Sequence, residues 1–136
     1  DRDTTKRAIM GEISGKIADY TIITSDNPRT EDPEEIVKEV ESGIKRTKGK
    51  YVCIVDRKKA IEHAIKMATK NDIVVLAGKG HETYQEVNGV KNPFDEKTII
   101  VVICNYNNYI ISNNTNIKKI KSWSNGKNRR STIPFR

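Results

Sequence analysis

The stretch that decides the fold is YTIITSDNPR at residues 20–29. Its first half, residues 20–24, is a nearly continuous apolar run, as in strands that helices cover on both faces of a parallel sheet. Its second half, Asp26-Asn27-Pro28-Arg29, predicts a stiff loop, because proline fixes one backbone dihedral and cannot continue the strand. Residues 73–77 repeat this arrangement and lead into a second loop, Gly78-Lys79-Gly80-His81-Glu82.

Helical periods separate these strands along the chain. Gly43 is a mild weakness near the end of one of the predicted helices. The predicted order is helix 5–18, strand 20–24, a helix begun by Asp32 and Pro33, strand 51–55, a helix begun by Asp56, and strand 73–77. This alternation predicts an α/β fold with a Rossmann-like, doubly wound and mainly parallel sheet. Asn88-Gly89 predicts the tight turn of a small hairpin.

The two loops predict a ligand site, because ligands bind outside the carboxyl ends of the strands in an open parallel sheet. Arg29 can offer its planar fork to a carboxylate, a bidentate geometry that lysine cannot copy. Asp26, Asn27 and Glu82 can accept hydrogen bonds from an ammonium group. Glycine lets the backbone approach a ligand closely. This combination suits a small zwitterion with both amino and carboxylate groups.

Each loop also has an ordinary structural interpretation. The first loop is rich in turn-forming residues, and composition alone leaves a plain turn and a binding site equally open. The second loop is compatible with a glycine turn that carries a solvated His81 and Glu82. At Lys79, an ordinary solvated lysine is favoured over a contact with phosphate. The spacing of His and Cys residues predicts no metal site.

Length and cysteine usage exclude several classes of protein. The 136 residues are one domain's worth of chain, enough to bury a core. No apolar run reaches about 18 residues, so we expect no membrane span. Cys53 and Cys104 lie far apart within apolar runs and fit neither a disulfide framework nor a CxxC site. We therefore expect structural thiols and a cytoplasmic location.

The net charge of +7 is concentrated in the last part of the chain. Eight of the 25 basic residues lie after Glu96, but none of the 18 acidic residues does. Residues 1–96 therefore have 17 basic and 18 acidic residues and a net charge of −1. Residues 98–104 are strongly β-forming, and the Asn-rich sequence from about residue 112 predicts poor order. The tail is either a nucleic-acid-binding arm or a frameshifted reading of an AT-rich sequence. We favour the second interpretation, because a basic run alone is a weak signal.

Taken together, several segments resemble the C-terminal domain of the Mur ligases, in the branch that adds meso-diaminopimelate. Order and spacing agree from residue 1 to about residue 96, so the resemblance is more specific than any single motif. The matching segments are DRDTTKR at 1–7, Met10-Gly11, Ala18-Asp19-Tyr20, TSDNPRTEDP at 24–33, Asp56-Arg57, AGKGHETYQ at 77–85 and Phe94-Asp95.

The resemblance implies an ATP-dependent amide ligase of peptidoglycan synthesis. In the family, the terminal carboxylate of UDP-N-acetylmuramoyl-L-alanyl-D-glutamate is phosphorylated, and the amine of meso-diaminopimelate attacks the acyl phosphate. The Asp-Asn-Pro-Arg sequence marks members that add meso-diaminopimelate rather than L-lysine. Arg29 would pair with the second carboxylate of diaminopimelate, and lysine would leave the guanidinium unpaired.

The resemblance also implies which residues hold the incoming amino acid. Asp26 and Glu82 would favour its ammonium groups, and Arg2 would help to orient a carboxylate. This is catalysis by positioning, without a covalent nucleophile. The implied substrate-binding residues are Arg2, Asp26, Asn27, Pro28, Arg29, Gly78 and Glu82. No catalytic residue and no metal ligand is expected in this chain.

Departures from the family pattern predict a fragment. The family's strand and glycine-rich turn before residue 1 are absent, and so are the N-terminal UDP-sugar domain and the central domain that mainly binds ATP and Mg²⁺. After Phe94-Asp95 the family continues into an amphipathic helix, whereas this chain continues into sequence rich in Ile, Asn and Lys. We expect residues 1–96 to form a partial amino-acid-binding domain without its first strand, and residues 97–136 to be a divergent tail. The chain would be monomeric, would bind no cofactor of its own and would be inactive alone.

Two alternatives to this function stay open. The first is a free-standing Rossmann-like module that binds an amino acid or a nucleotide. The second is binding of nucleic acid through the basic tail.

Overall fold

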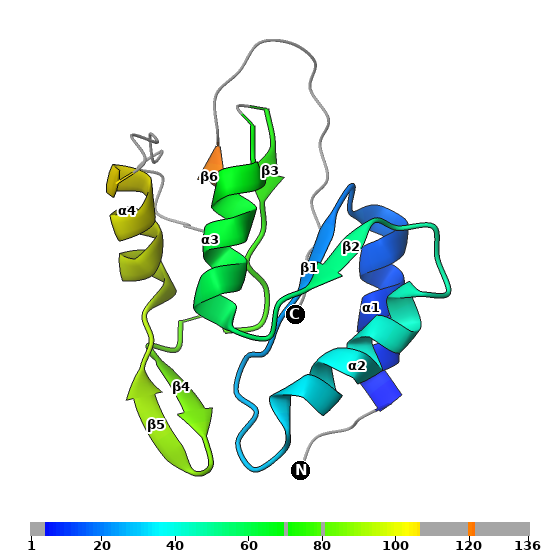
Figure 1. The fold of residues 1–136 in the computed structure, drawn as a ribbon, viewed down its shortest axis with the longest axis horizontal. Coiled ribbons are helices and arrows are strands. Elements are labelled where there is room, and N and C mark those ends of the chain that lie inside the picture. The colour runs from blue at the N-terminus through cyan, green and yellow to red at the C-terminus, as the bar shows by residue number, and fades with distance from the viewer. Residues whose placement is uncertain (1–4, 70, 80, 107–119, 122–136) are drawn as a thin grey trace. The chain divides into compact units, whose positions relative to one another are not determined.

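A computed structural model describes residues 5–69, 71–79, 81–106 and 120–121 (Figure 1). The chain divides into two compact units. Unit 1 contains residues 1–60 and 86–92, and unit 2 contains residues 61–85 and 93–136. Each unit is described by itself below. The poor order predicted from about residue 112, and the nucleic-acid arm, concern residues that apart from 120–121 lie outside the described ranges.

Unit 1 confirms the predicted alternation of helices and strands. Its elements are α1 (Thr5–Ile17), β1 (Thr21–Ile23), α2 (Pro33–Ile44) and β2 (Tyr51–Cys53). β1 and β2 pair in parallel, with Thr21 opposite Tyr51 and Ile23 opposite Cys53. The core of the unit consists of Ile23, Val37 and Ile44, with Val40, Tyr51, Cys53 and Val55 packed against it. The predicted cap of α2 is also confirmed, since the Asp32 side chain accepts from the Glu34 amide at 2.8 Å.

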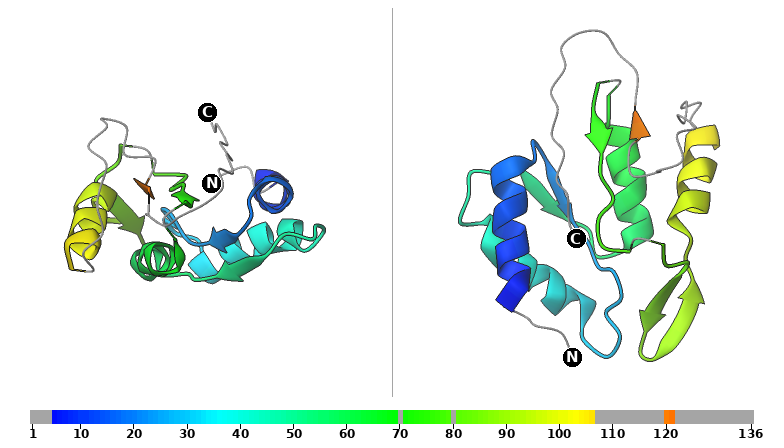
Figure 2. Two further views of the ribbon diagram at one scale, coloured as in Figure 1. Left: turned by 90° about the horizontal axis from the view of Figure 1, so that it is seen from above. Right: turned by 180° about the vertical axis from the view of Figure 1, so that it is seen from behind.

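α1 and α2 touch through their backbones, and Figure 2 shows the two helices side by side. A methyl group at Gly11 would overlap the carbonyl oxygen of Val40, and one at Gly43 would overlap that of Ala8. Gly43 therefore is the point of closest helix contact. The sequence prediction of a mild weakness at this position was incomplete, because helix propensity does not register the space that a neighbouring helix leaves.

An arginine joins α1 to α2 and to the segment that precedes it. Arg7 is a buried residue that is 9% exposed. Its guanidinium donates two parallel hydrogen bonds to Glu31, at 2.8 and 2.9 Å. Its Nη1 also donates to Glu39 Oε2 at 2.9 Å. Because bidentate pairs fix orientation as well as distance, this arginine determines how the chain enters α2.

In unit 2, α3 (Arg57–Met67) and α4 (Glu96–Tyr106) supply most of the core. α3 begins at Arg57 in unit 1, after Asp56, whose side chain accepts from the Lys59 amide as predicted for its cap. β3 (Ile73–Val74) pairs antiparallel with β6 (Ile120–Lys121). The buried cluster contains Ile61, Ile65, Ile100, Ile103 and Cys104.

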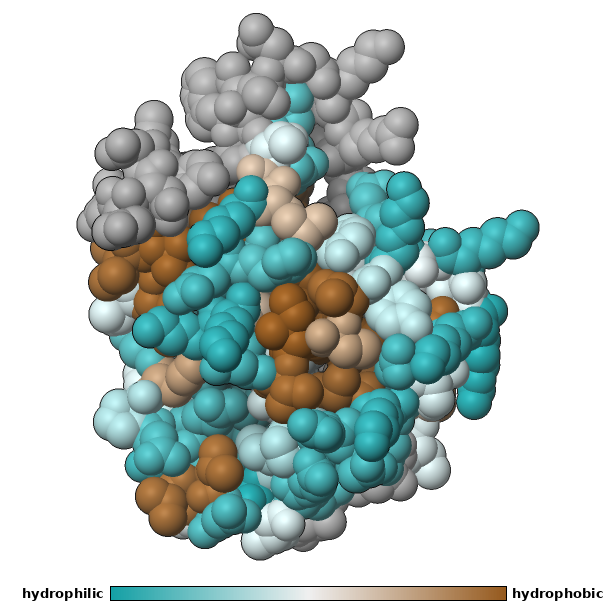
Figure 3. Space-filling view, viewed as in Figure 1, coloured by the Kyte–Doolittle hydropathy of each residue, from teal (hydrophilic) through white to brown (hydrophobic). Residues whose placement is uncertain are grey.

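The strand predicted over residues 98–104 is wrong, because these residues lie inside α4. Asp95 caps the helix, since its carboxylate accepts from the Lys97 amide at 3.0 Å and from the Thr98 hydroxyl at 2.8 Å. Ile100, Ile103 and Cys104 recur at helical spacing and are buried. A cap and tertiary burial here outweigh the β propensity of the Ile and Val residues. Figure 3 shows hydrophobic residues exposed over α4, where Val101 and Val102 are 40% and 62% exposed.

The predicted hairpin is confirmed as β4 (Tyr84–Val87) and β5 (Val90–Pro93). Its turn has positive φ at Asn88 (51°) and Gly89 (75°), as two-residue hairpin loops require. Among the described residues the strands form two-stranded sheets only, β1 with β2, β3 with β6 and β4 with β5. The α/β class with a parallel strand pair is confirmed.

Both cysteines are free thiols, as predicted. Burial raises the pKa of Cys104 and of Cys53, so both thiols are poorly ionised at neutral pH. In the described ranges, none of the helices combines the length and apolar character needed to cross a bilayer.

The glycine contact predicts that Gly11→Ala destabilises the protein despite the better helix propensity of alanine. We expect the free energy of unfolding to fall by about 2 kcal/mol, because the methyl group forces α1 away from α2. Ser42→Ala, at an exposed position of α2, is the control and should change it by less than about 0.5 kcal/mol. Urea denaturation measures both, and a Gly11→Ala protein as stable as the parent contradicts the close contact.

The cap of α4 predicts that Asp95→Ala lowers the free energy of unfolding by about 1 kcal/mol at neutral pH. The Thr98 hydroxyl and the backbone amides hold the pKa of Asp95 below its usual range. A lowered folded-state pKa stabilises above the unfolded-state pKa of about 4, and this stabilisation is lost as the pH falls through the folded value. Denaturation at pH 7 and at pH 3 should therefore show a smaller effect of Asp95→Ala in acid. An equal difference at both pH values would contradict the cap.

Candidate functional site

The first predicted loop follows the carboxyl end of β1 directly. The end of β1 is tied to the chain after β2, because the Ser25 amide donates to Val55 O at 3.2 Å. The buried Arg57 also donates to Ser25 O, at 3.4 Å. Within the loop, Pro28 is buried and its carbonyl accepts from the Glu31 amide at 2.9 Å. The loop therefore has a fixed start and a closed turn.

Arg29 has a left-handed backbone conformation, with φ of 55°. This conformation costs a residue with a side chain about 1–2 kcal/mol, so surrounding contacts have to hold it. The Arg29 amide donates to Glu86 O at 3.0 Å, and the Asn88 amide donates to Arg29 O. Arg29 and Val87 thus form an isolated parallel β-bridge. We call Glu86, Val87 and Asn88 the hairpin tip.

The hairpin tip also orients two side chains of the loop. Asn27 Oδ1 accepts from the Glu86 amide at 3.0 Å, so the hairpin tip fixes the orientation of the Asn27 side-chain amide. Glu86 Oε2 lies 3.9 Å from Arg29 Nε. The Arg29 side chain is 39% exposed. A guanidinium is suited to a carboxylate, which it can bind through two parallel hydrogen bonds.

The second loop belongs to unit 2 and contains a buried lysine. The Lys79 side chain is 0% exposed, and its Nζ lies 5.9 Å from the Tyr84 ring centre and 5.7 Å from that of Phe94. Glu82 Oε2 lies 4.0 Å from Lys79 Nζ. The prediction of a solvated lysine is wrong, because two aromatic faces and a carboxylate replace water around the ammonium group.

The rest of this loop matches the prediction in part. Gly78 has φ of 110°, which favours glycine over residues with side chains. The Glu82 amide donates to Lys79 O at 3.1 Å, and the Glu82 side chain is 34% exposed. His81 is exposed. Gly80 lies outside the described residues.

The structure thus describes six of the seven predicted substrate-binding residues. Asp26, Asn27, Pro28 and Arg29 form one cluster in unit 1, while Gly78 and Glu82 belong to unit 2. A common site for the two loops stays a prediction. Arg2 lies outside the described residues. Sequence reasoning missed the hairpin tip, because the Asn88-Gly89 signal predicts a hairpin without indicating what it contacts.

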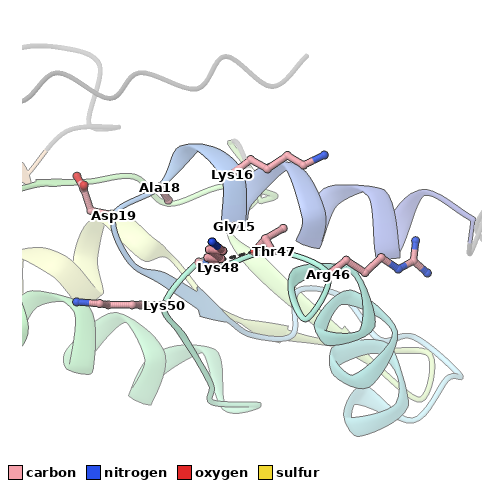
Figure 4. Close-up of a pocket in the computed structure, with 9 residues that line it drawn as sticks. Gly15, Lys16, Ala18, Asp19, Arg46, Thr47, Lys48 and Lys50 are labelled. Carbon is pink, nitrogen blue, oxygen red and sulfur yellow. Dashed lines mark hydrogen bonds between the residues drawn. The ribbon is translucent and has the colours of Figure 1, made fainter.

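Unit 1 has a basic hollow that lies away from the predicted ligand-binding loop (Figure 4). It lies before β1 and before β2, at the amino ends of the parallel strands, whereas Arg29 follows a carboxyl end. In Figure 4, Lys16, Arg46 and Lys50 point in different directions and do not converge. The lining residues are Gly15, Lys16, Ala18, Asp19, Arg46, Thr47, Lys48, Gly49 and Lys50.

The described residues contain no group of three or more His, Cys, Asp or Glu side chains that could hold a metal ion. The predicted substrate-binding residues of unit 1 carry a guanidinium, an amide and a carboxylate, which are groups that can hydrogen-bond to the charged groups of a ligand.

The chain is similar to a known protein family. Residues 1–80 match the family described as Mur ligase, glutamate ligase domain. This range contains both the first loop and the start of the second.

Curated relatives with the name UDP-N-acetylmuramoyl-L-alanyl-D-glutamate–2,6-diaminopimelate ligase are similar over most of this chain. The protein of Caldanaerobacter subterraneus subsp. tengcongensis is 54% identical over 100 residues, which are 74% of this chain and 21% of the relative. The protein of Alkaliphilus metalliredigens is 56% identical over 96 residues, 71% of this chain and 19% of the relative. The chain therefore spans about one fifth of the length of these relatives.

A solved structure of a ligase with the same name has a similar fold. It superposes with a TM-score of 0.74 at 42% sequence identity, over 81% of this chain and 23% of the solved chain. The sequence and the fold of this chain are thus similar to the same family.

The strained backbone at Arg29 predicts different effects for two substitutions that both remove the guanidinium. Arg29→Gly should change the free energy of unfolding by less than about 1 kcal/mol, because relief of the positive φ offsets the greater freedom of glycine in the unfolded chain. Arg29→Ala keeps the strain and should be about 1 kcal/mol less stable than Arg29→Gly. Urea denaturation compares the two. An alanine variant at least as stable as the glycine variant would show that the left-handed conformation is not maintained.

Proposed function

This chain belongs to the Mur ligase family, and on that premise we propose that it is the amino-acid-binding part of a ligase that joins meso-diaminopimelate to UDP-N-acetylmuramoyl-L-alanyl-D-glutamate. The names of its relatives support both substrates. Residues 1–96 would contain the residues that bind the amino acid. The tail would begin after α4, because Ile100, Ile103 and Cys104 of that helix belong to the core of unit 2. A reaction that consumes ATP and uses a substrate with a uridine nucleotide is consistent with a cytoplasmic enzyme.

One observation carries the choice of amino acid, namely that the Arg29 guanidinium, in the loop after the carboxyl end of β1, is in contact with the Glu86 carboxylate and 39% exposed. Diaminopimelate has a second carboxylate and a second ammonium group at the end where L-lysine has only an ammonium group. A carboxylate can accept two parallel hydrogen bonds from the guanidinium. Lysine would place its own positive charge near Arg29 and leave the guanidinium without that partner, which disfavours its binding.

The other proposed contacts divide the remaining charges of the amino acid. Asp26 and Glu82 would accept from its ammonium groups, Gly78 would let the backbone approach, and Arg2 would orient a carboxylate. Held in this way, the amine that forms the new amide faces its acceptor in one orientation. Such positioning accelerates a two-substrate reaction without any covalent bond to the enzyme.

ATP, with Mg²⁺, activates the acceptor carboxylate in the reaction proposed. The described residues offer no carboxylate cluster for the metal ion. The role proposed for this chain is therefore confined to binding and orienting the amino acid, and no step is assigned here to the nucleotide.

A two-dimensional amide NMR titration of the chain with meso-diaminopimelate and with L-lysine tests this function. A dispersed spectrum first establishes that the chain is folded. We expect amide signals around residues 26–29 and 78–82 to shift with diaminopimelate and not with lysine. Arg29→Gln should weaken diaminopimelate binding by about 10- to 100-fold, the value of a charged hydrogen-bonded pair.

Arg46→Gln is the matched control, because Arg46 is a 62% exposed arginine at the opposite end of the strands. It should bind diaminopimelate like the parent chain. A folded chain that ignores diaminopimelate, or that binds lysine equally well, would contradict the proposed function.

A further inference from the structure

The hairpin tip is the feature that the proposed function leaves unexplained. It lies in unit 1 with the first loop, although Asn27 and Glu86 are 59 residues apart in the sequence. Three contacts join them: Asn27 Oδ1 with the Glu86 amide, the Arg29 amide with Glu86 O, and the Asn88 amide with Arg29 O. All three use backbone groups of the tip, so they hold the loop whatever side chains the tip carries.

The Glu86 side chain adds a contact of a different kind. Its carboxylate is 3.9 Å from Arg29 Nε and its side chain is only 23% exposed. The contact is electrostatic, because the buried Arg29 Nε makes no hydrogen bond with the described residues and 3.9 Å is too long for one. Partial burial weakens screening by water, so the pair interacts more strongly than an ion pair on an open surface. A hairpin needs no acidic side chain at this position in order to form.

Glu86 lies on one side of the Arg29 guanidinium, so a ligand would approach from another side. A guanidinium can bind a carboxylate along its Nε side or through the fork at its Nη end. With Glu86 on the Nε side, a ligand carboxylate would approach the Nη fork. The Asn27 side-chain amide is oriented by the same tip.

We propose that Glu86 is a positioning residue for Arg29, and that the hairpin tip is thereby part of the amino-acid site and of its selectivity. The proposal rests on the proposed function for its ligand. Glu86 acts through Arg29 and does not itself touch the amino acid. Without the carboxylate, the guanidinium keeps its charge and loses one of the contacts that orient it, so a second carboxylate on the ligand is recognised less well.

Glu86→Gln tests the proposal, because glutamine keeps the size of the side chain and every backbone contact of the tip. We expect meso-diaminopimelate to bind about 5-fold more weakly, with the amide signals of the tip still dispersed. The heteronuclear NOE of the Arg29 Nε–H signal should fall in the absence of any ligand, because the side chain becomes more mobile. Glu86→Asp should restore part of both. Glu62→Gln, which removes a carboxylate from α3, is the control and should change neither.

A double-mutant cycle separates positioning from a general structural effect. If Glu86 acts through Arg29, adding Glu86→Gln to Arg29→Gln causes no further loss of diaminopimelate affinity. An equal additional loss in that background would overturn the positioning role. Unchanged Arg29 mobility and affinity in Glu86→Gln would also overturn it and leave the proposed function intact. Failure of the folded parent chain to bind diaminopimelate would overturn the proposed function and, with it, the role in selectivity.

Discussion

The backbone contact between α1 and α2 is the constraint on which the rest of unit 1 depends. Gly11 and Gly43 let the helices meet without intervening side chains. One turn before each glycine, the same approach brings Arg7 to Glu39, and the arginine reaches on to Glu31. The Glu31 amide closes the turn with Pro28 O, two residues after Arg29. The Arg7 guanidinium thus connects the close contact of α1 and α2 to the loop that contains Arg29.

Local sequence signals predicted most of the elements because those signals act within a few residues. Asp32 and Asp56 cap helices, and the Asn88-Gly89 turn forms the hairpin, through contacts with their immediate neighbours. The helix α4 was missed because its β-branched residues favour a strand on propensity alone. What decides it is the cap at Asp95 together with burial against α3, and that burial depends on residues far away in the chain.

The candidate site was predictable to the same extent. The loop at residues 26–29 follows its strand as expected, and its resemblance to Mur ligases agrees with the family match. The environment of Lys79 was not predictable, because the rings of Tyr84 and Phe94 reach it from outside its loop. The contact of Glu86 was not predictable either, because acidic residues are common on exposed hairpins and the sequence does not indicate which residue they contact. Its importance comes only from what it lies against.

The bridge between Arg29 and the hairpin has a consequence for the order in which the protein acquires its properties. Asn27 leaves the ribosome 59 residues ahead of Glu86, a delay of roughly 3 to 12 seconds at ordinary rates of translation. During that interval both strands of the parallel pair and the helices α1 and α2 are available to fold. The loop, however, still lacks the backbone partners that hold Arg29 in its left-handed conformation. A nascent chain can therefore be compact before it can bind a ligand, because the binding loop takes its final conformation only after the hairpin has been synthesised.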